Sequence, residues 1–149
     1  MEECFYCRII KSIIPSSIVY SDEKVMAILD AEPVNPGHVE IFPKTHITQL
    51  SELDEGTGAL MFKIAMRIAN ALRQSTVKCE GINLLLSDGK AASQHIMHVH
   101  LHVIPRFAGD NFEIRVKSKF GLKRGIRLNK RQLDEIAKEL RALLPQNQV

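Results

Sequence analysis

The sequence predicts a single domain of mixed α and β structure, and three patterns indicate it. Short apolar segments bounded by turn residues are typical of strands, and residues 98–103 alternate polar and apolar side chains most clearly. After Gly56, apolar residues recur every four positions, which indicates an amphipathic helix packed on a sheet. A second apolar stripe from Leu133 to Leu144 predicts another helix near the end of the chain.

Length and composition limit the class of protein. The chain has 149 residues, 45% of them hydrophobic and 25% charged, which suits one globular domain with a real core. No run approaches the roughly 20 apolar residues of a membrane span. The first residues lack the basic and apolar regions of a secretion signal. With three cysteines, an odd number, we expect a reduced, cytoplasmic protein.

The first half of the chain reads as three strands and a helix. Residues 19–21 and 25–29 flank a turn at 22–24, and a rigid loop at 33–37 leads into a third strand at 38–43. The series Ser51-Glu52-Leu53-Asp54 has the form of a capping box, so we expect the long helix to start there. The apolar stripe of this helix consists of Leu60, Ile64, Ile68 and Leu72.

The second half contributes two strands and the last helix. Residues 81–87 form the first of these strands, and residues 98–103 form the second. Asn129 caps the final helix, with Gln132 three residues on, and Pro145 stops it. We find no internal repeat and no second domain.

Three histidines share one face of the predicted strand 98–103. His98, His100 and His102 alternate with Val99, Leu101 and Val103. Their Cα atoms would span roughly 13 Å at about 3.3 Å per residue, so they can line one site without all touching one small atom. Imidazole titrates near neutrality and is costly to bury unpaired. The face therefore predicts a metal site, an acid/base site or a nucleophile.

A second motif, Cys4-x-x-Cys7, is ambiguous by itself. It is compatible with redox chemistry, with metal binding or with two unrelated thiols. A tetrahedral zinc ion needs four ligands, so two more would come from elsewhere in the chain. Cys79 has no motif partner, and we expect it to be packed.

The segment from Gln94 to Arg106 resembles the signature of the histidine triad (HIT) family, His-x-His-x-His followed by apolar residues. Residues 27–30, 36–46 and 81–94 are similar to other family segments, and Cys4-Phe5-Tyr6-Cys7 is similar to the motif of its zinc-carrying branch. The likeness covers about residues 4–107. The family usually has Gly at Ser93, a change that is compatible with the fold unless the backbone there needs positive φ. The family also often has Asn at Ser87, and Ser or Thr at His95.

The resemblance implies an α+β fold with an antiparallel sheet of about five strands and two main helices. It also implies a homodimer with a continuous sheet, and we place the helix from about Leu60 to Ser75 and a neighbouring strand at the interface. On this interpretation residues 1–149 form one HIT domain. The motif core is 4–107, and 108–149 hold a basic segment and the C-terminal helix.

The implied activity is cleavage at the α-phosphate of a purine nucleoside 5′-phosphoramidate or related conjugate, through a nucleotidyl-histidine. His100 would be the nucleophile, His102 would stabilise developing charge, and Gln94 would donate a hydrogen bond to phosphate or leaving group. The resemblance implies nucleotide contacts from Asp30, Asn83, Ser87, Ser93, Gln94 and His102. The resemblance places the loop 33–37 around the base. Two interpretations of Ile28, Leu29 and Ile41 stay open: they line the base pocket, or they belong to the core.

The resemblance also completes the metal site. It adds His46 and His98 to Cys4 and Cys7, and four protein ligands imply a structural zinc with no open position. It implies no catalytic metal and no organic cofactor. A histidine that binds zinc cannot act as a proton donor, which leaves that task to His102.

Two other functions stay open. One is a dinucleoside polyphosphate hydrolase with the same nucleophile, and the other is a zinc-stabilised nucleotide-binding module with incidental turnover. The formal net charge of +3 does not by itself indicate nucleic acid binding, and we expect no membrane partner. Residues 106–131 hold nine Lys and Arg, which form either a solvated segment or a cationic flank that attracts anionic substrates. They are Arg106, Arg115, Lys117, Lys119, Lys123, Arg124, Arg127, Lys130 and Arg131.

Overall fold

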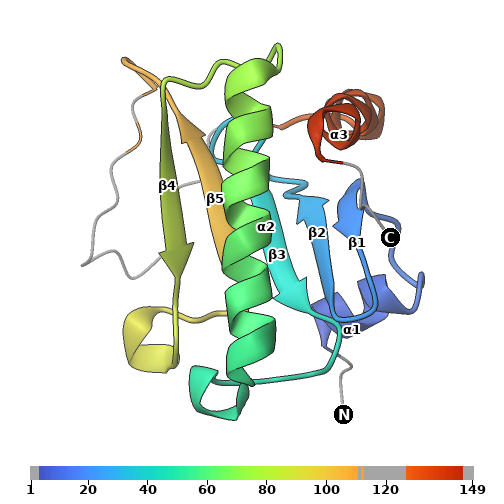
Figure 1. The fold of residues 1–149 in the computed structure, drawn as a ribbon, viewed down its shortest axis with the longest axis vertical. Helices are drawn as coiled ribbons and strands as arrows, with labels where there is room; N and C mark the ends of the chain where they lie inside the picture. Colours follow the sequence, from blue (N-terminus) through green and yellow to red (C-terminus); the bar gives the residue numbers. More distant parts are fainter. Residues whose placement is uncertain (1–3, 111, 113–126, 146–149) are drawn as a thin grey trace.

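The computed structural model describes residues 4–110, 112 and 127–145, and its centre is a five-stranded antiparallel sheet (Figure 1). The strands lie in the order β1-β2-β3-β5-β4. Their bounds are Ile18–Ser21 for β1, Val25–Leu29 for β2, Val39–Pro43 for β3, Gly81–Leu86 for β4 and Leu101–Arg106 for β5. The predicted α+β class and the number of strands are confirmed.

In the part of the chain that the structure describes, three helices cover the sheet. They are α1 (Phe5–Ile10), α2 (Glu55–Gln74) and α3 (Lys130–Leu143), with short 3-10 turns at η1 (Leu50–Glu52) and η2 (Lys90–Ala92). Figure 1 shows α2 lying along one face of the sheet, with α3 beside it above β1 and β2. Among the described residues, no helix combines the length and hydropathy needed to cross a membrane.

The main core lies between the sheet and α2. Ile64, Ile68 and Leu72 of the predicted stripe are almost fully buried there. The helix begins later than predicted, because Asp54, not Ser51, accepts the capping hydrogen bond from the backbone N–H of Thr57 at 2.9 Å. Ser51 belongs to η1 instead.

The last helix begins where the sequence indicates. The side chain of Asn129 accepts from the backbone N–H of Gln132, whose own side chain accepts from the backbone of Asn129. Leu133, Ala137 and Leu140 are buried against the main core. Local capping chemistry and an apolar stripe were therefore sufficient to locate α3.

The strand predicted to carry the three histidines starts three residues later than predicted, so His98 and His100 precede it and His102 lies within it. The backbone N–H of Val99 donates to the carbonyl of Ile47 at 2.7 Å, outside the sheet ladder, and β5 begins at Leu101. The alternation itself holds. Val99, Leu101 and Val103 belong to the main core.

The opposite face of the sheet has a smaller core under α1. Tyr6, Ile9, Met26, Ile28 and Phe42 form it. On β3, Phe42 belongs to this smaller core and Ile41 to the main core, because successive side chains of a strand point to opposite faces. Ile41 is therefore a core residue and does not line the pocket.

Candidate metal centre and active site

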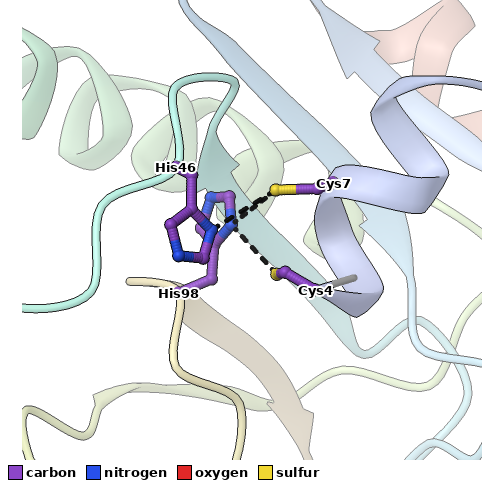
Figure 2. A group of neighbouring side chains, drawn as sticks. All are labelled: Cys4, Cys7, His46 and His98. Carbon is purple, nitrogen blue, oxygen red and sulfur yellow. Dashed lines mark hydrogen bonds between the residues drawn. The ribbon is translucent and has the colours of Figure 1, made fainter. Parts of the chain in front are cut away.

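The four predicted metal ligands come together from three separate segments. Cys4 caps α1 and Cys7 lies one turn later, while His46 follows β3 and His98 precedes β5. In Figure 2 the two sulfur atoms and the two imidazole rings point toward one another. The i, i+3 spacing of the cysteines places both thiols on one side of the start of α1.

The spacing of these atoms fits tetrahedral zinc. The Nδ1 of His98 lies 3.4 Å from the Sγ of Cys4 and 3.8 Å from the Sγ of Cys7, and the Nδ1 of His46 lies 3.3 Å from the Sγ of Cys7. All four ligand atoms lie within 4.8 Å of one another. Zinc bonds of about 2.0–2.3 Å give tetrahedral edges of roughly 3.3–3.8 Å, so the donor set matches the ion in chemistry and size.

The hydrogen bonds of His98 leave the correct nitrogen for a metal. Its Nε2 lies 2.8 Å from the carbonyl oxygen of Pro43, which can only accept, so the proton sits on Nε2. The lone pair is then on Nδ1, which faces the thiols. Burial lowers the pKa of His98 to about 4, which keeps the ring neutral near pH 7. A ligand histidine held by a backbone carbonyl is a common arrangement in metal sites.

His100 has the opposite arrangement. Its Nδ1 donates to the carbonyl oxygen of His98 at 2.8 Å, so its free lone pair is on Nε2. Burial lowers the pKa of His100, and the residue is 7% exposed. The ring of Tyr6 packs against it, with ring centroids 5.1 Å apart. His100 is therefore a neutral, oriented imidazole of the kind a nucleophile requires.

His102 is paired with a histidine for which the sequence suggested no role. The Nε2 of His38 lies 2.9 Å from the Nδ1 of His102. The backbone N–H of Val34 donates to the Nδ1 of His38, so the proton of neutral His38 sits on Nε2 and points at His102. His102 then carries its own proton on Nε2. Sequence reasoning missed His38 because it precedes β3, far in sequence from the triad.

Glu40 is a second residue that sequence reasoning missed. It is 6% exposed, and its Oε1 lies 3.7 Å from the Nδ1 of His102. A charged residue inside an otherwise apolar strand was the available signal. Glu40, His100 and His102 also form a candidate metal group by distance. The bond from His38 already uses the Nδ1 lone pair of His102, which disfavours a metal there.

A cavity of about 600 Å³ opens beside these residues. Its lining includes Phe5 and Ile9 of α1, Ile28 and Leu29 of β2, and Glu40 of β3. Asp30, at the end of β2, also lines it, and the backbone N–H of Glu32 donates to the carboxylate of Asp30 at 2.9 Å. An apolar slot with convergent carboxylates suits a nucleoside.

The loop 33–37 does not line this cavity. Val34 packs with Ile104 and Phe112, and the side chain of Asn35 donates to Asp110 and to the carbonyl of Pro105. The loop braces the far end of β5, and its predicted place around the base stays a prediction.

The loop before the histidines is held by Gln94. Its Oε1 accepts from the backbone N–H of Gly89 at 2.7 Å, and its Nε2 donates to the carbonyls of Thr48 and Ile96. Its predicted contact with phosphate or leaving group therefore stays a prediction. Exposed Ser93 has φ of 66°, in the left-handed region that favours glycine, so this chain accepts strain where the family usually has Gly.

The other two predicted nucleotide contacts, Asn83 and Ser87, belong to β4 and the residue after it. The side chain of Asn83 accepts from Arg106, beyond His102 along the sheet, and half-buried Ser87 follows β4. Arg106 is also paired with Asp110, so it is not a free cation. Five of the nine basic residues, Arg115, Lys117, Lys119, Lys123 and Arg124, lie outside the described residues.

Comparison with known proteins agrees with the motifs. A family model described as HIT domain matches residues 11–109. An uncharacterized HIT-like protein of Borreliella burgdorferi is 38% identical over 130 residues, which cover 87% of this chain and 88% of that protein. A protein of Arabidopsis thaliana named adenylylsulfatase HINT3 is 38% identical over 104 residues, which cover 70% of this chain and 52% of that protein.

Solved structures share the fold. A Zn-bound histidine triad family protein from Mycobacterium smegmatis superposes with a TM-score of 0.77 and 35% identity, covering 95% of this chain and 92% of that one. A HIT-like protein from Bartonella henselae gives a TM-score of 0.80 at 30% identity, with coverage of 95% and 96%.

Proposed function

Because the chain belongs to the HIT domain family, a family of nucleotide-binding hydrolases and transferases, we propose that it cleaves purine nucleoside 5′-phosphoramidates or related conjugates at the α-phosphate. The observation that carries the proposal is the free Nε2 lone pair of buried, neutral His100. An imidazole oriented by a backbone carbonyl is a competent nucleophile near pH 7.

Two displacements account for the reaction. In the first, the Nε2 of His100 attacks the α-phosphorus, a bond from phosphorus to nitrogen forms, and the bond to the leaving group breaks. The leaving group keeps the electron pair and takes a proton from the Nε2 of His102, which the hydrogen bond from His38 orients. In the second, water attacks phosphorus and gives a proton to the Nε2 of His102, the bond to His100 breaks with its electron pair returning to the Nε2 of His100, and a nucleoside monophosphate is released.

The cavity supplies the binding part of the proposal. The base lies against Phe5, Ile9 and Ile28, and the carboxylate of Asp30 accepts from ribose hydroxyls. Carboxylate oxygens suit neighbouring hydroxyl donors. Asn83, Ser87, Ser93, Gln94 and His102 remain the proposed phosphate and nucleotide contacts.

We propose that Cys4, Cys7, His46 and His98 hold one structural zinc ion per chain. The tetrahedral spacing of the four donor atoms supports it, as does the Zn-bound relative. Four protein ligands leave no open position for water, so the ion would pin α1 to the segment that carries His100. Since Phe5 and Ile9 of α1 line the cavity, the ion would also stabilise the nucleoside pocket.

A homodimer completes the proposal. β4 is an edge strand of the sheet, and its Leu84 is 38% exposed. Phe62 and Met66 on the outer face of α2 are 54% and 55% exposed. Pairing of two β4 edges with α2 against α2 would bury these apolar side chains and continue the sheet. A monomer mass in light scattering across micromolar concentrations would contradict this assembly.

The test of the activity is to trap the intermediate. Zinc-loaded protein is mixed with an adenosine 5′-phosphoramidate labelled in the phosphate, quenched, and searched for an acid-labile adduct on His100. Parallel rates on a diadenosine polyphosphate and on adenylyl sulfate assign the leaving group. Faster cleavage of the polyphosphate would support the dinucleoside alternative. Nucleotide binding without any adduct or turnover would support the binding module instead.

A further inference from the structure

Glu40 lies on the sheet face that carries the smaller core, between Ile28 of that core and His102. In the register of the strands it is opposite Ile28 on β2 and opposite His102 on β5. The three residues therefore form a straight row across neighbouring strands about 4.8 Å apart. At one end of the row is the apolar wall of the cavity, and at the other end are the reactive histidines.

The carboxylate of Glu40 is buried but reaches the cavity. The residue is 6% exposed, and it lines the same space as Ile28 and Asp30. Its Oε1 lies 3.7 Å from the Nδ1 of His102, which is longer than a hydrogen bond. A carboxylate offers several acceptor positions on its two oxygens, so Glu40 can accept from a ligand in the cavity in addition to its contacts within the protein.

The row determines which part of a nucleotide meets Glu40. A nucleotide with its base against Ile28 and its α-phosphorus near His100 has its sugar between the two. The sugar then lies over Glu40. The ribose hydroxyls are the donors on that part of the molecule, and a carboxylate has two oxygens to accept them.

We propose that Glu40 is a specificity-determining residue that accepts a hydrogen bond from one ribose hydroxyl, with Asp30 accepting from the other. The inference rests on the proposed function and adds to it a selection of ribonucleotides over deoxyribonucleotides. Asp30 already accepts from the backbone N–H of Glu32, so a second carboxylate adds acceptor capacity where two hydroxyls must be satisfied. A site that buries an acceptor for a hydroxyl rejects ligands that lack the hydroxyl.

The experiment compares three ligands by calorimetry on zinc-loaded protein: adenosine 5′-monophosphate and its 2′-deoxy and 3′-deoxy analogues. Wild type should bind the ribonucleotide roughly 10- to 100-fold more tightly than at least one analogue, the range expected for a hydrogen bond to a charged group. Glu40→Leu should weaken ribonucleotide binding by a similar factor and leave the affinity for that analogue nearly unchanged.

Two further variants separate the hydrogen bond from charge and from folding. Glu40→Gln keeps an acceptor oxygen at the same place without the charge, so it should retain much of the discrimination. Glu32→Gln removes a charge from the same cavity and keeps the backbone donor to Asp30, so the ratio of affinities should not change. Thermal denaturation of each variant confirms that it is folded.

The outcomes distinguish this inference from the function on which it rests. Equal binding of all three ligands by wild type, or an equal loss for all three in Glu40→Leu, would overturn the role of Glu40 alone. That role is also overturned if Glu40→Gln loses as much as Glu40→Leu for every ligand, since Glu40 would then act through charge on His102. Wild type that binds none of the three would overturn the nucleotide site as well.

Discussion

His98 and His100 stand two residues apart on one segment, and we propose different roles for them. Each donates one ring N–H to a backbone carbonyl, but from a different nitrogen. His98 uses Nε2 toward Pro43, which leaves Nδ1 for the thiols, and His100 uses Nδ1 toward His98, which leaves Nε2 for a substrate. The carbonyl that each ring meets therefore decides which ring nitrogen keeps its lone pair, Nδ1 for the proposed metal and Nε2 for the proposed attack on phosphorus.

Burial gives the two rings a common property. It lowers the pKa of both, so each keeps a lone pair at neutral pH. The difference lies in the neighbours. His98 faces Cys4, Cys7 and His46, whereas His100 packs against His102. The following predictions test this contrast, in order of decreasing effect.

Removing the nucleophile should have the largest effect. We expect His100→Ala to abolish turnover of the phosphoramidate and formation of the adduct, a loss of several orders of magnitude. Zinc content and nucleotide binding should stay near wild type, because neither depends on the Nε2 of His100. Exposed His95 provides the matched control, and His95→Ala should retain activity. An adduct on His100→Ala, or a rate within tenfold of wild type, would refute the assignment.

Removing the metal should chiefly change stability. Purified protein should contain one zinc per chain, measured by elemental analysis under reducing, chelator-free conditions. Cys7→Ser or strong chelation should lower Tm by about 10 °C or more, since the loss of a structural zinc costs several kcal/mol. If wild-type protein contains no zinc and its Tm does not change on chelation, the cluster is two thiols and two histidines without a metal.

His102→Ala should be milder than His100→Ala. It removes one stabilising contact and proton donor, which costs on the order of 3 kcal/mol, or roughly 100-fold in kcat. The trapped adduct should still form, more slowly. If single-turnover rates show that His102→Ala is as inactive as His100→Ala, the two residues act as one unit and the assignment of separate roles fails.

The pH dependence should distinguish His100 from an ordinary histidine. Because burial lowers its pKa, His100 should still be neutral as pH falls through 6.5, the usual value for histidine. Ring C–H signals in NMR, assigned with His100→Ala, should titrate below pH 6.5. The neutral nucleophile is thus retained on the acid side and lost only as pH falls through the lowered pKa. A His100 signal that titrates at or above pH 6.5 would contradict this.

The smallest effect concerns the loop that leads into both histidines. Ser93 is held at φ of 66°, so Ser93→Gly should relieve backbone strain. We expect a gain of about 0.5–1 kcal/mol, offset in part by the greater freedom of glycine when unfolded, and a Tm higher by a few degrees. A calorimetric Tm lower than that of wild type would mean that the hydroxyl makes a contact worth more than the strain.

Local patterns in the sequence determined much of this protein. Alternation separated Val99, Leu101 and Val103, which lie in the main core, from His98, His100 and His102 on the other side of the segment, where His102 lies within β5. Capping chemistry located α3. The resemblance predicted one cluster of Cys4, Cys7, His46 and His98, and the structure brings these residues together. These features follow from short-range periodicity or from recognisable motifs, which a single sequence carries.

Only the tertiary structure decided which groups each functional side chain contacts. Three features depend on how segments distant in sequence pair in the sheet. They are the row from Ile28 through Glu40 to His102, the contact of His38 with His102, and the start of β5 at Leu101. The same holds for the protonated nitrogen of each histidine, since the accepting carbonyls of Pro43 and His98 are placed by the fold. A sequence pattern predicts the face on which a side chain lies. The protonation and reactivity of that side chain depend on its contacts with residues distant in sequence.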